Sequence, residues 1–433
     1  MSRSVAPARS IRGTLRVPGD KSIAHRALML GALADGTTRI DGLPDGADVA
    51  STRRCLEALG VAICEVGASV AVVGLGRSGA LGAAGTRLDC GNSGTTMRLL
   101  AGILAARDGD WTLDGDASLR ARPMRRVAEP LRAMGAAVEL QAGDVAPMRV
   151  RGNCALRAID YRLPLPSAQL KSALLLAGLS ANGTTTLSGA LEGRDHTERM
   201  LPAFGARVER RNGTLAVRGG QHLTAARVRV PGDVSSAAYW IAAATLLPDS
   251  EVTIVDVGLN PTRLGFLEVL RRMGADIERN VREENHREEN PEPVGTIVAR
   301  SARLRATDVE PAEVPALIDE LPLLAVLAAF AEGTTTVRGA AELRVKESDR
   351  IDAVVRSGRA MGMRIDPFPD GFAVHGPALL DGASIDAGGD HRIAMAFAIA
   401  ALAAHGDSAI ADAESASVSY PGFFSALESL RDG

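Results

Sequence analysis

Lysine is rare in this chain, and its few positions mark the first candidates for chemistry. Of 49 basic residues only three are lysines, namely Lys21, Lys171 and Lys346, so arginine supplies the general-purpose positive charge. A lysine ammonium can give up a proton, whereas an arginine guanidinium stays charged. We therefore expect Lys21 and Lys346 to take part in chemistry, while Lys171 could equally be a structural helix residue.

Two acids, Asp319 and Glu347, complete this reactive set. Asp319 precedes an apolar helix, where an unpaired carboxylate would be costly, and Glu347 directly follows Lys346. The other candidates are polar or cationic residues at helix starts and in the loops that face them: Ser22, Arg26, Asn92, Gly94, Arg122, Ser167, Gln169, Arg194, Arg350 and Arg392. Such a set predicts a site that binds a substrate with several negative charges and transfers protons on it.

Helix starts must position these residues. Residues 88–104 run from a short strand through Gly91-Asn92-Ser93-Gly94 into an apolar helix from about Thr95. Asn92 and Ser93 are good capping residues, and the glycines let a ligand approach the backbone. The free amides and the positive dipole end of a helix start can hold an anion. Similar starts near residues 22, 167, 235, 319 and 391 give a period of roughly 70 residues.

This repeat predicts the fold. The first helix of several units ends in Gly followed by a β-branched strand, and a second helix ends in an apolar residue followed by Gly. We expect an α/β (α+β) protein with two domains, each of three β-α-β-α-β-β units. The phrase Val-Pro-Gly-Asp occurs at 17–20 and at 230–233, which suits hinges. The predicted domains are residues 20–230 and residues 1–19 plus 231–433.

Composition and motifs exclude several classes of protein. The net charge of −3 argues against nucleic-acid or membrane partners, and the four cysteines lack CxxC spacing, which favours the cytoplasm. The seven histidines form no HExxH motif, so we expect no metal site. The sequence Gly74-Leu75-Gly76-Arg77-Ser78-Gly79 matches a dinucleotide motif, but no helix is expected to open there, so we expect no cofactor. The charged segment 280–294 is expected to be a solvated loop or hairpin extension without chemistry.

Taken together, the motifs resemble the 5-enolpyruvylshikimate-3-phosphate synthase family along essentially the whole chain. The phrases that carry the resemblance are Pro18-Gly19-Asp20-Lys21-Ser22, Gly91-Asn92-Ser93-Gly94-Thr95, Ala121-Arg122-Pro123, Ser167-Ala168-Gln169, Arg194-Asp195-His196-Thr197-Glu198, Arg344-Val345-Lys346-Glu347-Ser348-Asp349-Arg350 and Asp390-His391-Arg392. The resemblance implies that the enolpyruvyl group of phosphoenolpyruvate (PEP) is transferred to the 5-hydroxyl of shikimate 3-phosphate, with release of phosphate. It also implies that the helix N-termini of the two domains face an interdomain cleft, that the protein is a monomer without cofactors, and that glyphosate is an inhibitor that competes with PEP.

The resemblance also assigns roles to residues. Ser167, the amide of Ala168, Gln169 and Arg194 would hold the 3-phosphate. The residues implied for the shikimate ring are Lys21, Ser22, Arg26, Asp319 and Lys346. Those implied for PEP are Lys21, Gly94, Arg122, Gln169, Arg350 and Arg392, with Asn92 shaping the loop. Asp319 would take the hydroxyl proton or offset a cationic carbon, and Glu347 would shuttle a proton with Lys21, and these roles stay open at this stage.

The chain departs from the family pattern at three positions. Val418 stands where many relatives carry Lys, Leu99 where many have Pro, and Glu342 where some have Asn. The sister family, UDP-N-acetylglucosamine enolpyruvyl transferase, places a Cys where this chain has Ala117. A non-catalytic binder on the same scaffold would be expected to lack Asp319, Glu347 or Lys21. Both alternatives therefore fit the residues less well.

Overall fold

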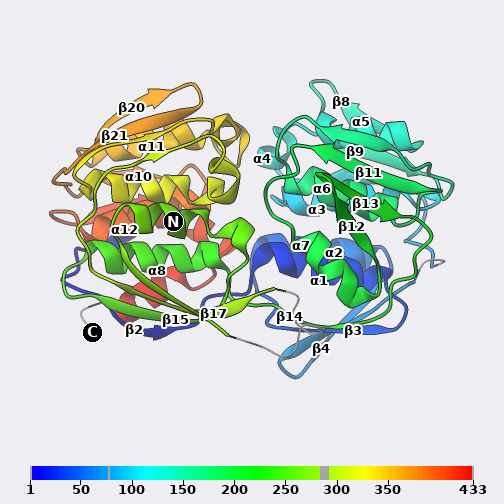
Figure 1. Cartoon of the computed structure of the whole chain (residues 1–433), viewed down its shortest axis with the longest axis horizontal. Helices are drawn as coiled ribbons and strands as arrows, with labels where there is room; N and C mark the ends of the chain where they lie inside the picture. The colour runs from blue at the N-terminus through cyan, green and yellow to red at the C-terminus, as the bar shows by residue number, and fades with distance from the viewer. Residues whose placement is uncertain (1, 77–78, 283–291, 432–433) are drawn as a thin grey trace. The chain divides into compact units, whose positions relative to one another are not determined.

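The chain forms two compact units in a computed structural model that describes residues 2–76, 79–282 and 292–431. We call the first the N-unit; its described residues are 19–76, 79–230 and Glu292. The second, the C-unit, contains described residues 2–18, 231–282 and 293–431. Figure 1 shows both units with their elements labelled.

Three four-stranded sheets build the N-unit, and all follow one plan. A parallel pair of strands is extended by two antiparallel strands, so the crossover between the parallel strands is available to a helix. The first sheet has the order β14 (Arg227–Arg229), β3 (Thr37–Asp41), β5 (Ser69–Val73) and β4 (Ala62–Val66). The second has β6 (Thr86–Asp89), β7 (Gly109–Asp114), β9 (Val145–Gly152) and β8 (Ala137–Gln141). The third has β10 (Asp160–Leu163), β11 (Thr184–Gly189), β13 (Thr214–Arg218) and β12 (Val208–Arg211).

The C-unit repeats this plan twice and shortens it once. Its first sheet has the order β2 (Arg12–Leu15), β15 (Glu251–Gly258), β17 (Val294–Arg300) and β16 (Asp276–Val281). The second has β18 (Asp308–Val309), β19 (Gly333–Val337), β21 (Gly371–Gly376) and β20 (Arg364–Phe368). The third has only β22 (Ser384–Asp386), β23 (Ser408–Ala411) and the N-terminal strand β1 (Arg3–Val5), which takes the antiparallel place beside β23.

Two strands pair outside the unit to which their following helix belongs. Strand β2 leads into the first helix of the N-unit but pairs with β15 in the C-unit, with Arg12 opposite Glu251. Strand β14 leads into the first helix of the C-unit but pairs with β3, with Arg227 opposite Arg39. This exchange explains why the Val-Pro-Gly-Asp phrase occurs twice, because each copy follows one of the two exchanged strands.

Helices fill the interior of each unit. Those of the N-unit are α1 (Lys21–Leu33), α2 (Ala47–Ala58), α3 (Gly94–Ala105), α4 (Ala117–Arg120), α5 (Arg125–Met134), α6 (Ala168–Gly178), α7 (His196–Met200) and η1 (Leu201–Phe204). Those of the C-unit are α8 (Val234–Leu246), η2 (Pro261–Arg263), α9 (Gly265–Arg272), η3 (Val314–Ala316), η4 (Ile318–Glu320), α10 (Leu321–Phe330), η5 (Ala341–Val345), α11 (Arg350–Ala360), α12 (His391–Leu402), η6 (Ala413–Val418) and α13 (Phe423–Leu430).

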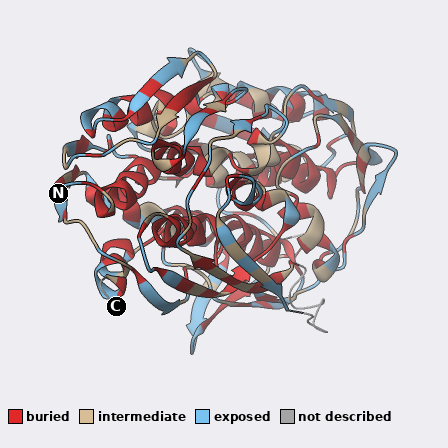
Figure 2. Cartoon of the chain, turned by 60° about the vertical axis from the view of Figure 1, so that its left-hand side comes forward, coloured by how far each residue is buried: buried red, intermediate tan, exposed pale blue. Residues whose placement is uncertain are grey.

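The first helix of each repeat is buried on nearly every side. Each residue of α12 and all but the last of α10 are buried, as the sequence predicts for helices that are apolar all round. Strands instead alternate buried and more exposed residues, because one sheet face covers the helices and the other faces water. Figure 2 shows this contrast, with red helices inside and pale blue stretches along the strands. Each unit therefore has its own apolar core.

Several predicted elements need correction. Strand β2 covers only Arg12–Leu15, and β1 was not predicted because its three residues carry no alternating pattern. The charged segment 280–294 is only partly described: Asn280 and Val294 lie in the paired strands β16 and β17, and residues 283–291 lie outside the described residues. Glu292, which we expected to be solvated, is buried. Within the described part of the chain, none of the helices has the length and apolar character needed to cross a membrane.

Candidate functional site

Side chains cap the three central helices of the N-unit. The oxygens of Asp20, Ser93 and Ser167 accept hydrogen bonds from first-turn amides of α1, α3 and α6 at 3.0, 3.1 and 3.3 Å. Of the two capping residues expected at the 91–94 loop, Ser93 is the one that caps. Ala168 is the first residue of α6, so its amide belongs to the donors that a helix leaves without an intrahelical partner.

Lys21 opens α1 and forms an ion pair that the sequence did not predict. Its Nζ lies 2.8 Å from Oδ2 of Asp48, which stands in the first turn of α2 and is buried. The other carboxylate oxygen of Asp48 is buried without a hydrogen-bond partner among the described residues. Asp48 thus fixes the ammonium of Lys21 at the start of α1. Only one feature of the sequence indicates this ion pair, namely an acid at the start of a second helix.

Arg26 connects α1 to α6 and to α7, the short helix that follows Arg194. Its guanidinium donates to Oγ1 of Thr197, to Oγ of Ser172 and to the carbonyl of Ser22, each at 2.7 Å. Burial lowers the pKa of Arg26 to about 10, although the charge of a nearby glutamate opposes this change. Nη1 of Arg194 lies 3.4 Å from the hydroxyl of Ser22, so Ser22, Arg26 and Arg194 lie together.

Arg122 and Asn92 form a second polar cluster in the N-unit. Nη2 of Arg122 donates to Oδ1 of Asn92 at 2.6 Å and to Oγ of Ser118 at 3.2 Å. The side-chain amide nitrogen of Asn92 in turn donates to Oδ2 of Asp116 at 2.7 Å. Because Asp116 also caps the short helix α4, this chain of bonds holds Arg122 beside the 91–94 loop.

Gln169 joins α6 to the same loop region. Its Oε1 accepts from Nη1 of Arg98 at 2.7 Å, and its Nε2 donates to Oγ1 of Thr95 at 3.0 Å. A Cβ placed on Gly94 would lie 2.7 Å from Nη1 of Arg98 and 3.4 Å from Nη1 of Arg122. The glycine therefore leaves room for two guanidinium groups. Arg98 was missed because one arginine within a helix is a weak signal in a chain so rich in arginine.

The third lysine, Lys171, is an internal ion-pair residue. Its Nζ lies 2.7 Å from Oε1 of Glu198 and 3.1 Å from the carbonyl oxygen of Leu191, and its side chain is 2% exposed. The alternative that Lys171 is a structural helix residue is the one that this geometry favours.

Replacing Lys171 by methionine should lower the free energy of unfolding by about 3 kcal/mol, because the buried carboxylate of Glu198 loses its partner. Urea denaturation at neutral pH would measure the loss. The double variant Lys171→Met with Glu198→Gln removes both charges and should recover at least half of it. A double variant as unstable as the single one would show that packing, and not the unpaired charge, sets the loss.

Arg350 organises the polar residues of the C-unit. Its side chain is 1% exposed, and it pairs with Asp390 at 2.8 Å, Glu347 at 2.7 Å and Asp319 at 3.3 Å. Burial alone would lower the pKa of Arg350, but these three carboxylates raise it above its ordinary value. Lys346 approaches the same Asp319 oxygen at 3.5 Å. The predicted residues Asp319, Lys346, Glu347 and Arg350 are thus brought together.

Arg392 follows the cap of α12 and is buried within the same unit. Its Nη1 lies 3.5 Å from Oε1 of Glu320, which also accepts a short hydrogen bond from Ser235. Burial raises the pKa of Tyr239 to about 12, while a hydrogen bond with Arg392 opposes the rise. Glu320 and Tyr239 were not predicted, although Glu320 directly follows Asp319 in the sequence.

The comparisons with known proteins fit this geometry. The model of the family described as EPSP synthase (3-phosphoshikimate 1-carboxyvinyltransferase) matches residues 5–427. The chain belongs to the EPSP synthase family. It is therefore a transferase of the shikimate pathway, which leads to aromatic amino acids, with 3-phosphoshikimate 1-carboxyvinyltransferase activity. The resemblance inferred from the motifs is confirmed, and the match favours this family over the sister transferase.

Relatives of the EPSP synthase family match the chain over nearly its full length. It is 50% identical to the 3-phosphoshikimate 1-carboxyvinyltransferase of Synechococcus sp. (strain JA-3-3Ab), covering 99% of this chain and 96% of the relative. The counterpart from Thermosynechococcus vestitus is 51% identical, with 98% and 96% covered. The EPSP synthase structure from Acinetobacter baumannii has a TM-score of 0.86 at 39% identity, with 99% and 98% covered. The enolpyruvyl transferase NikO from Streptomyces tendae has a TM-score of 0.80 at 21% identity, with 99% and 96% covered, which shows the shared fold alone.

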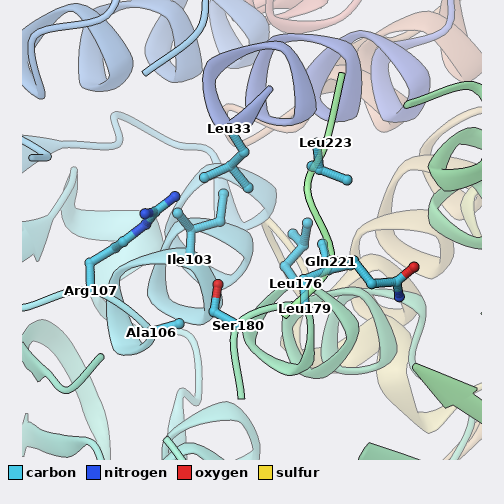
Figure 3. A pocket seen from close by; sticks show the side chains of 9 residues that line it. All are labelled: Leu33, Ile103, Ala106, Arg107, Leu176, Leu179, Ser180, Gln221 and Leu223. Carbon is cyan, nitrogen blue, oxygen red and sulfur yellow. The ribbon is translucent and has the colours of Figure 1, made fainter. Parts of the chain in front are cut away.

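A pocket at the opposite ends of the central N-unit helices carries none of the predicted EPSP synthase site residues. Figure 3 shows the side chains that line it: Leu33, Ile103, Ala106, Arg107, Leu176, Leu179, Ser180, Gln221 and Leu223. These residues lie at or beyond the C-terminal ends of α1, α3 and α6 and near residue 222, away from the capped helix starts. The lining is mostly apolar, so the pocket is a packing gap between helix ends.

Proposed function

We propose that shikimate 3-phosphate binds mainly to the helix starts of the N-unit. Ser167, the amide of Ala168, Gln169 and Arg194 hold its phosphate, and Lys21, Ser22 and Arg26 hold its ring. In the C-unit, Asp319 and Lys346 are assigned to the same ring. The capped start of α6 supports the phosphate assignment, because a helix N-terminus stabilises an anion by about 0.3–1 kcal/mol.

PEP is assigned to the cations beside the 91–94 loop and around Asp319. In the N-unit the cations are Lys21 and Arg122, and the neutral amide of Gln169 joins them; Gly94 leaves room, and Asn92 holds Arg122. In the C-unit they are Arg350 and Arg392. Guanidinium groups suit this task, because they bind carboxylates and phosphates through paired hydrogen bonds.

The proposed reaction is an addition followed by an elimination. The methylene carbon of PEP takes a proton, and the 5-hydroxyl oxygen bonds to the neighbouring carbon while its own proton is lost. Phosphate then leaves that carbon, and one methyl proton is removed so that the double bond returns. We assign the hydroxyl proton to Asp319 and the carbon-bound proton to Glu347 acting with Lys21.

The observation that carries this proposal is the cluster around Arg350. Asp319 and Glu347 each bond a different nitrogen of one buried guanidinium, so their carboxylates keep a fixed separation and orientation. Two carboxylates held in this way can serve two proton transfers on one substrate. Lys346 adds a second cation beside Asp319.

A phosphate-release assay tests the proposal. With PEP and shikimate 3-phosphate the protein should release one phosphate per enolpyruvyl product, whereas UDP-N-acetylglucosamine as the acceptor should give none. Release with the nucleotide sugar, or none with shikimate 3-phosphate, would contradict the proposed acceptor.

We expect glyphosate to inhibit this reaction competitively with PEP, and Gly94→Ala to weaken the inhibition at least tenfold, which corresponds to about 1.4 kcal/mol. The added methyl group would meet Nη1 of Arg98 at 2.7 Å, so that guanidinium must move into the space beside the loop. Initial rates at varied PEP and glyphosate measure the inhibition constant. Gly143→Ala, at an N-unit glycine where a Cβ meets nothing within 4 Å, serves as the control. Its φ of +88° makes alanine strain the backbone and lowers stability, but the inhibition constant should stay unchanged. Equal inhibition of Gly94→Ala and wild type would contradict the expectation.

We also propose that the protein acts as a cytoplasmic monomer. We propose that it needs no metal or cofactor, because the proposed chemistry uses only side-chain acids, ammonium and guanidinium groups. Light scattering during size exclusion would test the monomer. Activity that persists after dialysis against a chelator would support the metal-free mechanism, and activity restored only by a metal would contradict it.

A further inference from the structure

A chain of buried hydrogen bonds inside the N-unit ends at the cap of α3. Nδ1 of His25 lies 2.7 Å from Oγ1 of Thr52, which lies 2.6 Å from Oγ1 of Thr96. The Thr96 hydroxyl donates to Oγ of Ser93 at 2.8 Å, and Ser93 is the residue that caps α3. Each of these four side chains is fully buried. None of His25, Thr52 and Thr96 belongs to the proposed substrate ligands.

The hydrogen bonds of this chain run in one direction. A threonine hydroxyl has a single hydrogen, and Thr96 gives its hydrogen to Ser93. Thr52 must therefore donate to Thr96, and His25 must donate to Thr52 through Nδ1–H. The network thus assigns the Nδ1–H tautomer to His25. Nε2 is left as an acceptor without a partner among the described residues.

The surroundings keep the His25 ring neutral. Burial lowers the pKa of His25 well below its ordinary value, and the nearby charges of Lys21 and Arg26 lower it further. The direction of donation along these hydrogen bonds therefore does not reverse near neutral pH.

This chain of hydrogen bonds fixes the 91–94 loop against α1, which carries Lys21, and α2, which carries Asp48. His25 lies in α1 one turn after Lys21, and Thr52 lies in α2 one turn after Asp48. Further contacts from the same part of α2 reach the strand side of the loop: Sγ of Cys55 donates to the carbonyl of Asp89 at 3.3 Å. The hydrogen bonds thus hold the first turns of α1, α2 and α3 together next to the loop.

We propose that His25, Thr52 and Thr96 are positioning residues that hold the 91–94 loop and so set the affinity for PEP. The inference rests on the proposed function, in which Gly94 and Asn92 shape the place of PEP. An unsupported cap lets the loop and the first turn of α3 shift. The position of Arg122 shifts with Asn92, whereas the ligands proposed for the 3-phosphate lie on α6 and near Arg194.

Steady-state kinetics of hydroxyl-to-methyl variants test the proposal. Thr96→Val and Thr52→Val should each raise KM for PEP about five- to tenfold, the effect of one lost buried hydrogen bond. Values of KM for shikimate 3-phosphate and of kcat should change by less than about twofold, because the ligands proposed for its phosphate lie on α6 and near Arg194, and the proposed catalytic acids belong to the C-unit. The double variant should be no worse than the worse single variant, because both substitutions break one chain.

Substitution of His25 separates positioning from packing. His25→Leu should raise KM for PEP like the valine variants, whereas His25→Asn should restore it, because the side-chain amide can donate to Thr52 from nearly the same place as Nδ1–H. Thr185→Val is the matched control, because the hydroxyl of Thr185 is buried in the same unit without a hydrogen-bond partner among the described residues. It should leave both KM values unchanged.

Nitrogen-15 NMR of the histidine rings provides a readout independent of catalysis, and we expect the Nδ1–H tautomer for His25. The Nε2–H tautomer would overturn the inference. So would equal rises of KM for both substrates, or variants that melt earlier while KM for PEP stays at the wild-type value. Failure of wild-type enzyme to release phosphate from PEP and shikimate 3-phosphate would overturn the proposed function instead, and the tautomer would still report on the chain.

Discussion

Replacing Asp319 by asparagine, or Glu347 by glutamine, is expected to lower kcat by about 10²- to 10⁴-fold, the range for loss of a general acid or base. Both substitutions keep the size of the side chain and one oxygen for the hydrogen bond with Arg350. What they remove is the capacity to accept a proton. KM for both substrates should change by only about threefold or less, because the cations that bind charge remain in place. Steady-state phosphate release measures both constants.

Glu313→Gln is the matched control for this pair of variants. Glu313 also lies in the C-unit and forms an ion pair with an arginine, Arg272, at 2.7 Å, but it is partly exposed to solvent and belongs to no proposed site. Its loss should leave kcat unchanged. Near-normal turnover in Asp319→Asn or Glu347→Gln would remove that residue from proton transfer. A large rise in KM with unchanged kcat would make the residue a binding group only.

The repeat allowed most of the fold to be predicted from the sequence. Glycine after a helix and β-branched residues after the glycine are local signals, and they located the ends of the helices α1, α6 and α10 within a few residues. The exchange of β2 and β14 could not be predicted, because these strands pair with partners 239 and 188 positions away in the sequence. Strand β1 was missed because its three residues carry no alternating pattern, and its partner β23 is also distant in the sequence.

The site was predicted as a set of residues and not as a set of contacts. Scarcity of lysine drew attention to Lys21 and Lys346, and in the structure each of them lies beside an acid. The acids that hold the cations of the site, such as Asp48 for Lys21 and Glu320 for Arg392, are ordinary acids near helix starts, and only the packing of one helix against another gives them a role. The same limit applies to His25, because a histidine in an apolar helix gives no sign of its partner in the next helix.

Replacing Asp390 by alanine should lower the free energy of unfolding by about 3–5 kcal/mol, the usual effect of removing one partner of a buried ion pair. Asp390 is fully buried and accepts from Nε of Arg350 at 2.8 Å and from Oγ of Ser348 at 2.9 Å. Its other oxygen caps α12 by accepting from the amide of Arg392 at 2.9 Å. The substitution therefore weakens the hold on two arginines that the proposed function assigns to PEP, so activity should fall as well. Urea denaturation at pH 7 measures the stability.

The effect of Asp390 should also depend on pH. Burial by itself would raise the pKa of Asp390, but the charge of Arg350 outweighs it, and the pKa lies below its ordinary value. A carboxyl with a lowered pKa in the folded state stabilises the protein above the unfolded pKa, about 3.9, and loses that contribution as the pH falls through the folded value. The difference between wild type and Asp390→Ala should therefore be largest near neutral pH and shrink below about pH 4.

Asp349→Ala separates charge burial from capping in this prediction. Asp349 caps α11 and pairs with Arg344 at 2.7 Å, as Asp390 caps α12 and pairs with Arg350, but its side chain is 38% exposed. Loss of a cap costs about 1 kcal/mol, and an exposed ion pair adds little. If Asp390→Ala costs no more than Asp349→Ala at pH 7, the charge of Arg350 does not depend on Asp390, and Glu347 with Asp319 suffices to hold it. A loss several times larger identifies Asp390 as the residue that allows a fully buried arginine to stand beside the proposed catalytic acids.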